Sequence, residues 1–184
     1  MNDKKLRFEL SEICKKHDSQ AVPELNDLKN KYQHNILFIR SSSEFPEDIT
    51  GYEYALGLAN SNNYLQKIKK LRDLGFYCAC GNSFFMAWIA DIKKLLIPVN
   101  KKEITGGELI IYYESTVKHA GIVKNKDTIR SKWGTSGMYE HGILEIPIEY
   151  GENYCFFLKP NISEIEKYFD SYLNELALCI NSLY

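Results

Sequence analysis

The chain has 184 residues, which suits one compact domain of about 150 residues with a terminal extension better than two full domains. Its 23 Lys and Arg residues nearly balance its 24 Asp and Glu residues, for a net charge of −1, so the charge pattern is not that of a nucleic-acid-binding protein. With 45% hydrophobic residues, 11 Gly and 5 Pro, the chain is expected to bury a core and fold alone.

We expect a cytoplasmic chain with neither a nucleic-acid nor a membrane partner. The longest uncharged apolar run, at 84–90, is far shorter than the roughly 20 residues that span a bilayer. The first 18 residues carry charges at almost every turn and lack the apolar stretch of about 7 to 15 residues that a secretory signal requires. An odd number of cysteines favours reduced thiols over a disulfide framework. The five are Cys14, Cys78, Cys80, Cys155 and Cys179.

Two short helices and a strand are predicted at the start of the chain. Apolar residues at helical spacing within 6–14 predict the first helix, and Pro23 is expected to open a second one that runs to Tyr32. The short apolar run at 35–40, closed by three serines, favours a strand. We therefore expect residues 1–35 to form a helical N-terminal extension.

Three further helices are predicted in the middle of the chain. The string at 51–59 places its apolar residues on one face, as in a short buried helix. Asn62 is expected to cap a basic amphipathic helix that ends at Gly75. The third helix is expected to start at residue 82 or 83 and to stop at Pro98.

The second half of the chain has the pattern of an antiparallel meander followed by a helix. Ser163 and Glu166 match a capping box in front of apolar residues at helical spacing. Helices first and strands second predict one α+β domain over residues 36–184. The predicted strands are 109–113, 120–123, 128–130 and 154–158, with a turn at 124–127.

Phosphate-binding and metal-binding motifs are not found. The pair Gly106-Gly107 stands without the Lys-Ser/Thr of a phosphate loop, and no GxGxxG occurs. Cys78 and Cys80 are separated by one residue, where zinc sites usually leave two to four, and no second Cys or His pair lies nearby. We therefore expect no cofactor and no metal.

His119 is the strongest candidate for chemistry. It follows Lys118 and precedes Ala-Gly-Ile-Val, so a strand would hold the imidazole at the rim of the meander while small residues let another element approach. A histidine beside an apolar strand is also commonly structural. The sequence around it does not separate the two interpretations.

Three strings in the second half, GELIIYY, HAGIV and IRSKWG, carry a resemblance to a known family. Together they resemble the core of NlpC-type cell-wall peptidases and related papain-like cysteine hydrolases, over about residues 50 to 160. The resemblance implies a papain-like α+β fold, peptidase or amidase activity, and a peptide or protein as substrate or partner. Further residues resemble a bacterial branch of that fold: Ser131-Lys132-Trp133-Gly134, Glu140-His141, Pro147 and Tyr150-Gly151.

The nucleophile implied by the resemblance is missing. Such proteins carry a cysteine at the N-terminus of a buried helix, where the helix dipole and the strand histidine lower the thiol pKa, and His119 would be the base. The branch usually shows Asn-Cys-aromatic-x-Tyr-Ala-Leu-Gly, and residues 50–57 match it with Gly51 in place of the cysteine. A second alignment uses Ser83, with Cys80 just before it. Gly51 is favoured because of its distance from His119 in the sequence. It precedes His119 by 68 residues, which leaves room for a second helix before the sheet, whereas the 36 residues after Ser83 make a tight connection for this fold.

Three interpretations of this absence stay open. Glycine cannot attack a carbonyl, and an unassisted serine hydroxyl is a far weaker nucleophile than a thiolate. The chain is an inactive relative that binds a peptide or partner protein, a variant whose catalytic cysteine was replaced to trap a complex, or an enzyme that uses Cys80. In the first two cases we expect a void beside the imidazole of His119, where sulfur would stand.

The residue that would orient His119 is also open. Ser131 lies on the following strand, but a serine orients an imidazole poorly. His141 could reach the site from the next loop, with Glu140 holding its tautomer, although an exposed Glu-His pair on a loop is commonly only solvated.

Overall fold

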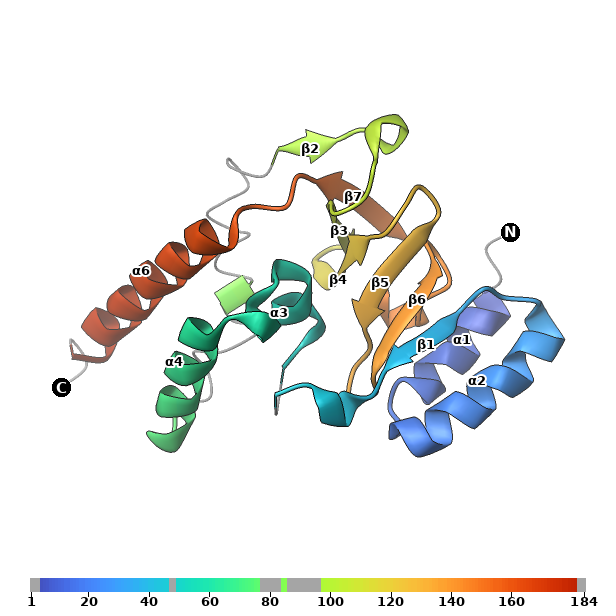
Figure 1. The fold of residues 1–184 in the computed structure, drawn as a ribbon, viewed down its shortest axis with the longest axis horizontal. Coiled ribbons are helices and arrows are strands. Elements are labelled where there is room, and N and C mark those ends of the chain that lie inside the picture. Colours follow the sequence, from blue (N-terminus) through green and yellow to red (C-terminus); the bar gives the residue numbers. More distant parts are fainter. Residues whose placement is uncertain (1–3, 47–48, 77–83, 86–96, 182–184) are drawn as a thin grey trace.

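The computed structural model describes residues 4–46, 49–76, 84–85 and 97–181, with side chains to residue 176. In this part of the chain, five α-helices surround a seven-stranded sheet, which confirms the α+β class (Figure 1). The helices are α1 (Lys4–Ile13), α2 (Asp18–Tyr32), α3 (Gly51–Leu56), α4 (Asn62–Asp73) and α6 (Ile162–Asn181). The strands are β1 (Leu37–Arg40), β2 (Pro98–Val99), β3 (Leu109–Tyr113), β4 (Val117–Val123), β5 (Thr128–Lys132), β6 (Met138–Gly142) and β7 (Asn153–Phe157).

The sheet has the strand order β1-β6-β5-β4-β3-β7-β2, and all of its pairs are antiparallel. β4 is the central strand and carries His119, which lies opposite Tyr112 of β3. The register shifts between Tyr112 and Tyr113, next to this pair. The predicted meander is therefore confirmed, but its histidine lies on the central strand and not, as expected, at the rim of the sheet.

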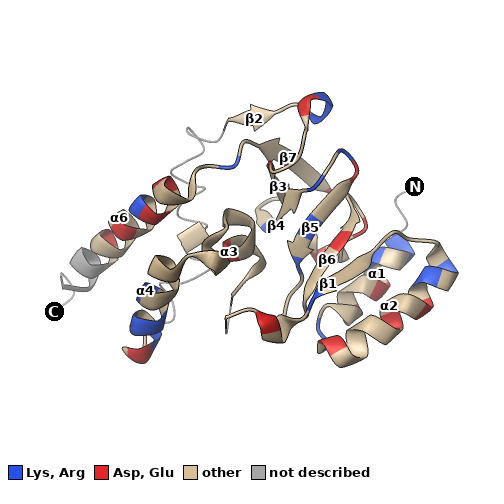
Figure 2. Ribbon diagram, viewed as in Figure 1, with Lys and Arg blue, Asp and Glu red and all other residues tan. Residues whose placement is uncertain are grey.

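Successive side chains of β3 enter two different cores, because residues of a strand alternate between the faces of a sheet. Leu109 and Ile111 belong to a cluster with α3, α4 and α6, whereas Ile110 and Tyr112 belong to a cluster with α1 and α2. Figure 1 shows α1 and α2 on one side of the strands and α3, α4 and α6 on the other. Lys and Arg are interspersed with Asp and Glu along the ribbon, without a region of one sign (Figure 2).

The N-terminal helices share the second core with the sheet. Leu6 and Leu10 of α1 and Leu25 of α2 are buried together with sheet residues such as Tyr139. The buried Arg7 donates hydrogen bonds to the carbonyl oxygens of Ile146 (3.1 Å) and Gly151 (2.7 Å), which lie between β6 and β7. The first 35 residues are thus held to the domain by apolar packing and by a buried guanidinium.

The predicted start of α2 is wrong. This helix begins at Asp18 rather than at Pro23, so the proline stands inside it. Burial of Ala21 and Leu25 against α1 extends the helix in front of the proline.

The capping residues of α4 and α6 also differ from the prediction. α4 is capped by Ser61 instead of Asn62, because the Ser61 hydroxyl accepts from the Tyr64 N–H at 3.0 Å. α6 is capped by Asn161 instead of Ser163: the Asn161 carboxamide oxygen accepts from the Ser163 N–H at 3.1 Å. Each cap lies one or two residues nearer the N-terminus than expected.

Strand β6 was not predicted. Residues 138–142 contain a glutamate and a histidine, so they lack a continuous apolar pattern, but they pair with β5 on one side and β1 on the other. His141 consequently lies on a strand and is 1% exposed, which corrects the expectation of an exposed Glu-His pair on a loop. The predicted third helix falls mostly outside the described residues. Phe84 and Phe85, which belong to it and are described, are helical and buried.

Candidate functional site

The start of α3 meets the imidazole of His119. Thr50 caps this helix: its hydroxyl accepts from the Glu53 N–H, and the Glu53 carboxylate accepts from the Thr50 N–H at 2.7 Å. A Cβ atom built on Gly51 would lie 2.9 Å from Cε1 and 3.3 Å from Nδ1 of His119. The structure therefore brings together Gly51 and His119, the two residues that the sequence paired.

The place of a Cβ at position 51, where a void beside the imidazole was expected, is crowded by neighbouring atoms. The same Cβ position at Gly51 lies 2.8 Å from the backbone oxygen of Lys132, closer than ordinary van der Waals contact allows. The His119 ring and the Lys132 carbonyl both close onto the glycine. A side chain at position 51 would have to displace backbone as well as the ring.

Two tyrosines surround His119, which is 4% exposed. The ring of Tyr150 stacks on the imidazole with centroids 3.9 Å apart and an interplanar angle of 11°, and the ring of Tyr112 lies 6.0 Å away. Nε2 of His119 is buried and has no hydrogen-bond partner among the described residues. One ring nitrogen thus faces the start of α3, and the other lacks the partner that would orient the ring.

Burial holds the pKa of His119 well below its ordinary value near 6.5, and positive charge on His141 and Lys132 acts in the same direction. The imidazole is therefore neutral at pH 7. A neutral imidazole beside a nucleophile would be able to accept a proton, but position 51 supplies none.

His141 is not the orienter of His119, because both of its ring nitrogens are bonded elsewhere. Nδ1 lies 2.8 Å from the Gly142 carbonyl oxygen, and Nε2 lies 2.8 Å from the Ser131 hydroxyl, which also accepts from the Trp133 indole at 2.9 Å. Nδ1 thus carries the proton, and the three side chains form one directed chain of hydrogen bonds. Burial lowers the pKa of His141 to about 4.

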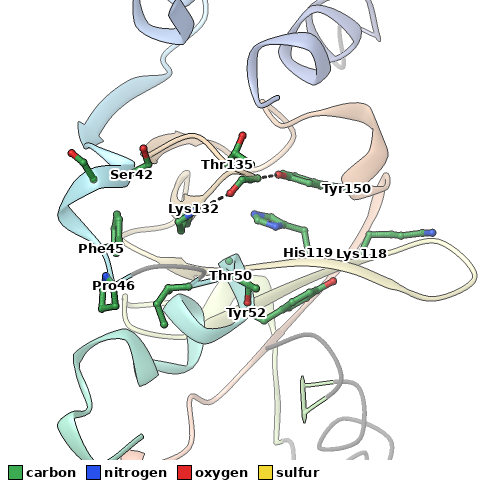
Figure 3. Close-up of a pocket in the computed structure, with 14 residues that line it drawn as sticks. Ser42, Phe45, Pro46, Thr50, Tyr52, Lys118, His119, Lys132, Thr135 and Tyr150 are labelled. Carbon is green, nitrogen blue, oxygen red and sulfur yellow. Dashed lines mark hydrogen bonds between the residues drawn. The ribbon is translucent and has the colours of Figure 1, made fainter. Parts of the chain in front are cut away.

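A pocket of about 730 Å³ opens at the junction of α3, β4 and the end of β5 (Figure 3). In Figure 3, His119 points towards Lys132, with Tyr150 beside it. The Tyr150 hydroxyl accepts from the Gly134 N–H at 3.1 Å and so anchors this wall. The lining residues fall into an apolar group of Phe45, Pro46, Ile49 and Tyr52, and a polar or glycine group of Ser42, Ser43, Thr50, Gly51, Lys118, His119, Lys132, Gly134, Thr135 and Tyr150.

None of the remaining candidates is placed at this site by the described part of the chain. Cys80 and Ser83 lie outside the described residues. The described thiols, Cys14 and Cys155, are free and do not line the pocket, and burial raises the pKa of Cys14 to about 11. Within the described ranges, no three His, Cys, Asp or Glu side chains gather as metal ligands would.

Tyr150 and Lys132 are site residues to which the sequence assigned no role. Both stand in the strings that carry the resemblance, but their spacing gives no sign that one stacks on the histidine and the other closes on Gly51. The local signal was an aromatic residue directly before a glycine at both places, Trp133-Gly134 and Tyr150-Gly151.

Comparison with known proteins returned no match: no family model, no curated protein and no solved structure is similar to this chain at the level that establishes a relationship. In the part of the chain that the structure describes, no helix is both long enough and apolar enough to cross a membrane. A function for this chain therefore has to be inferred from the geometry around His119.

Proposed function

We propose that this chain is a cysteine-hydrolase-type domain whose nucleophile position is held by Gly51, and that it binds a peptide in the pocket beside His119 without cleaving it. The observation that carries the proposal is the contact between Gly51, at the first position of α3, and the imidazole of His119 on β4. A helix start facing a buried strand histidine is the arrangement that thiol hydrolases use.

Three features support binding over catalysis. Position 51 has no nucleophile, Nε2 of His119 has no orienting partner among the described residues, and the Lys132 carbonyl lies 2.8 Å from the place of a Cβ at position 51. A triad without nucleophile and orienter retains little beyond binding energy. The pocket nevertheless has a volume of about 730 Å³, which is within the usual range of pockets that bind small ligands.

Restoring the thiol tests the ancestry of the site. We expect the thiol introduced by Gly51→Cys to react with iodoacetamide at pH 6 at least ten times faster than the thiol introduced by Ser43→Cys, which also lines the pocket. The imidazole would hold the thiol at position 51 as a thiolate, so His119→Ala in the Gly51→Cys background should lower the rate to that of the control. Site-resolved mass spectrometry reads each thiol, and urea unfolding verifies that each variant is folded.

Equal reactivity of the two introduced thiols would contradict the proposal. The unaltered chain provides the second readout, because a binding domain should hydrolyse no peptide. If Cys80 of the unaltered chain reacts rapidly, and His119→Ala abolishes that reaction, the chain is an enzyme with its nucleophile at Cys80 and the binding role is wrong.

A further inference from the structure

Among the residues that the structure describes, the pocket beside His119 is lined by cations and by no anion. Its lining residues include Lys118 and Lys132 and no Asp or Glu. Two carboxylates, Asp18 and Glu53, accept hydrogen bonds from residues that line the pocket. One oxygen of Asp18 accepts from the Ser42 N–H at 2.6 Å and from the Ser42 hydroxyl at 2.8 Å.

The other Asp18 oxygen accepts from the Ser136 hydroxyl at 3.0 Å, so this carboxylate is surrounded by donors of its own. Glu53 accepts from the Thr50 N–H and from the Tyr64 hydroxyl. These acids are therefore committed to the fold, and neither forms an ion pair with the pocket lysines in the described part of the chain.

Lys132 is the unusual member of the pocket, because a lysine that is only 6% exposed normally has an acidic partner. Its ammonium group donates to two backbone oxygens, those of Gly134 (2.8 Å) and Ser136 (3.3 Å). An ammonium has three donors, and both of these acceptors are neutral, so no described carboxylate is bonded to it. Burial lowers the pKa of Lys132, with Asp18 and Glu53 acting in the opposite direction.

Lys118 adds a second cation on the other side of His119, where Figure 3 shows its side chain extending away from Lys132. Lys118 is exposed and has no ion pair with any described residue. Charge at such a place steers an anion towards the pocket and is screened by salt. The two lysines thus differ in depth, one at the wall of the pocket and one in solvent.

We infer that the pocket recognises a carboxylate on its ligand, held at Lys132, with an apolar side chain of the same ligand against Phe45, Pro46 and Ile49. This rests on the proposed function, since it names the class of peptide that the site binds. The apolar wall and the volume leave room for more than a small anion. A peptide that ends in an apolar residue with a free carboxyl group has both features.

The test compares three small probes: N-acetylphenylalanine, N-acetylphenylalanine amide and N-acetylaspartate amide. Each is titrated into the ¹⁵N-labelled full chain at low salt and pH 7, and the backbone resonances of Gly51, Gly134 and Thr135 are followed. We expect N-acetylphenylalanine to bind at least ten times more tightly than its amide, because only the acid compensates the charge of Lys132. Tighter binding of N-acetylaspartate amide than of N-acetylphenylalanine would contradict a C-terminal carboxylate held beside the apolar wall.

Substitutions assign the preference to the lysines. Lys132→Met should remove most of the difference between acid and amide, and Lys118→Met should weaken acid binding two- to threefold and reduce its salt dependence. Lys126→Met, at another exposed lysine that does not line the pocket, is the matched control and should change neither. If Lys132→Met does not fold, the carboxylate preference is tested with Lys118→Met and by titrating N-acetylphenylalanine into the unaltered chain at increasing salt concentrations.

The outcomes separate this inference from the proposed function. Equal affinity for acid and amide overturns the carboxylate preference and leaves peptide binding intact. Absence of saturable shifts with all three probes overturns both.

Discussion

The two histidines in the middle of the sheet have opposite surroundings. His141 on β6 has a partner at each ring nitrogen, through Ser131 and Gly142, whereas His119 on β4 has a buried Nε2 with no partner in the described part of the chain. Both are almost fully buried. Burial alone therefore does not separate a structural histidine from a site histidine, but the state of their hydrogen bonds does.

The difference follows from what each ring packs against. His141 lies beside Trp133, whose indole completes a chain of hydrogen bonds that an interior position requires. His119 lies between Tyr150 and the first residue of α3, where aromatic and backbone surfaces offer its Nε2 no acceptor or donor. Proteins retain unpaired buried groups of this kind mainly at functional sites.

Acidification should weaken the fold through both histidines, and this is the largest effect we expect. Their pKa values lie below the unfolded value near 6.5, so below pH 6.5 the unfolded chain binds protons that the folded chain does not. Stability is fully present above pH 6.5 and falls by at most about 1.4 kcal/mol per pH unit for each histidine as the pH approaches 4. Urea unfolding between pH 7 and pH 5 measures the slope, which His141→Gln should reduce but not abolish, because His119 and the buried His34, whose pKa values are also lowered, keep contributing. An unchanged slope would show that His141 is protonated in the folded chain.

Removal of each ring sharpens the comparison. His141→Ala should lower the free energy of unfolding by about 3 kcal/mol, because it leaves a cavity and strands the Ser131 hydroxyl. His119→Ala should cost about 1 kcal/mol less, since it also removes a buried nitrogen that has no partner. Urea unfolding at pH 7.5 checks both values. A larger cost at position 119 would mean that its nitrogen is satisfied in the folded protein.

Filling the contact at Gly51 tests how tightly the site has closed. Gly51→Ala should cost about 2 kcal/mol, because its Cβ meets the Lys132 carbonyl and the His119 ring. Gly142→Ala is the matched control: the atoms near its Cβ belong to the flexible Glu145 side chain, so we expect a cost below about 1 kcal/mol. Adding His119→Ala to Gly51→Ala should recover part of the lost stability, because the imidazole ring is removed while the Lys132 carbonyl remains. Equal costs at the two glycines would contradict the closure.

The smallest effect is expected from the tyrosine that covers His119. Tyr150→Phe keeps the stacked ring but removes the acceptor of the Gly134 N–H, which should cost about 1 kcal/mol. The Gly134 amide should then exchange with solvent faster, as measured by NMR, while the amide of Gly121 in the sheet stays protected. Unchanged exchange at Gly134 would show that the bond is not formed in solution.

Most strands of the sheet and the start of α3 could be predicted because local signals agree with the fold, whereas the pairing of Gly51 with His119 came only from the resemblance to the hydrolase family. The apolar runs at 109–113 and 120–123 have the length and composition of strands, and the small residues after His119 allow close approach. The string at 50–57 carries a capping threonine, and α3 begins at Gly51 as expected.

The rest depended on contacts that sequence does not encode locally. β6 escaped prediction because Glu140 and His141 interrupt its apolar pattern, although Glu140 pairs with Arg130 on the neighbouring strand. The closed contact at Gly51 involves the Lys132 carbonyl, and every residue has a carbonyl, so no residue type announces it. The helix start at Asp18 was set by burial against α1 and overrode the signal of Pro23.

The guanidinium of Arg7 ties the beginning of the chain to the ring that lies on the imidazole. Its acceptors are the carbonyl oxygens of Ile146, Pro147 and Gly151, which stand on either side of Tyr150 in the sequence, so the first helix fixes the segment that places this ring over His119. Cleavage between α2 and β1 would therefore free one wall of the pocket without touching any residue that lines it. The first helix thus supports one wall of a pocket to which it contributes no lining residue.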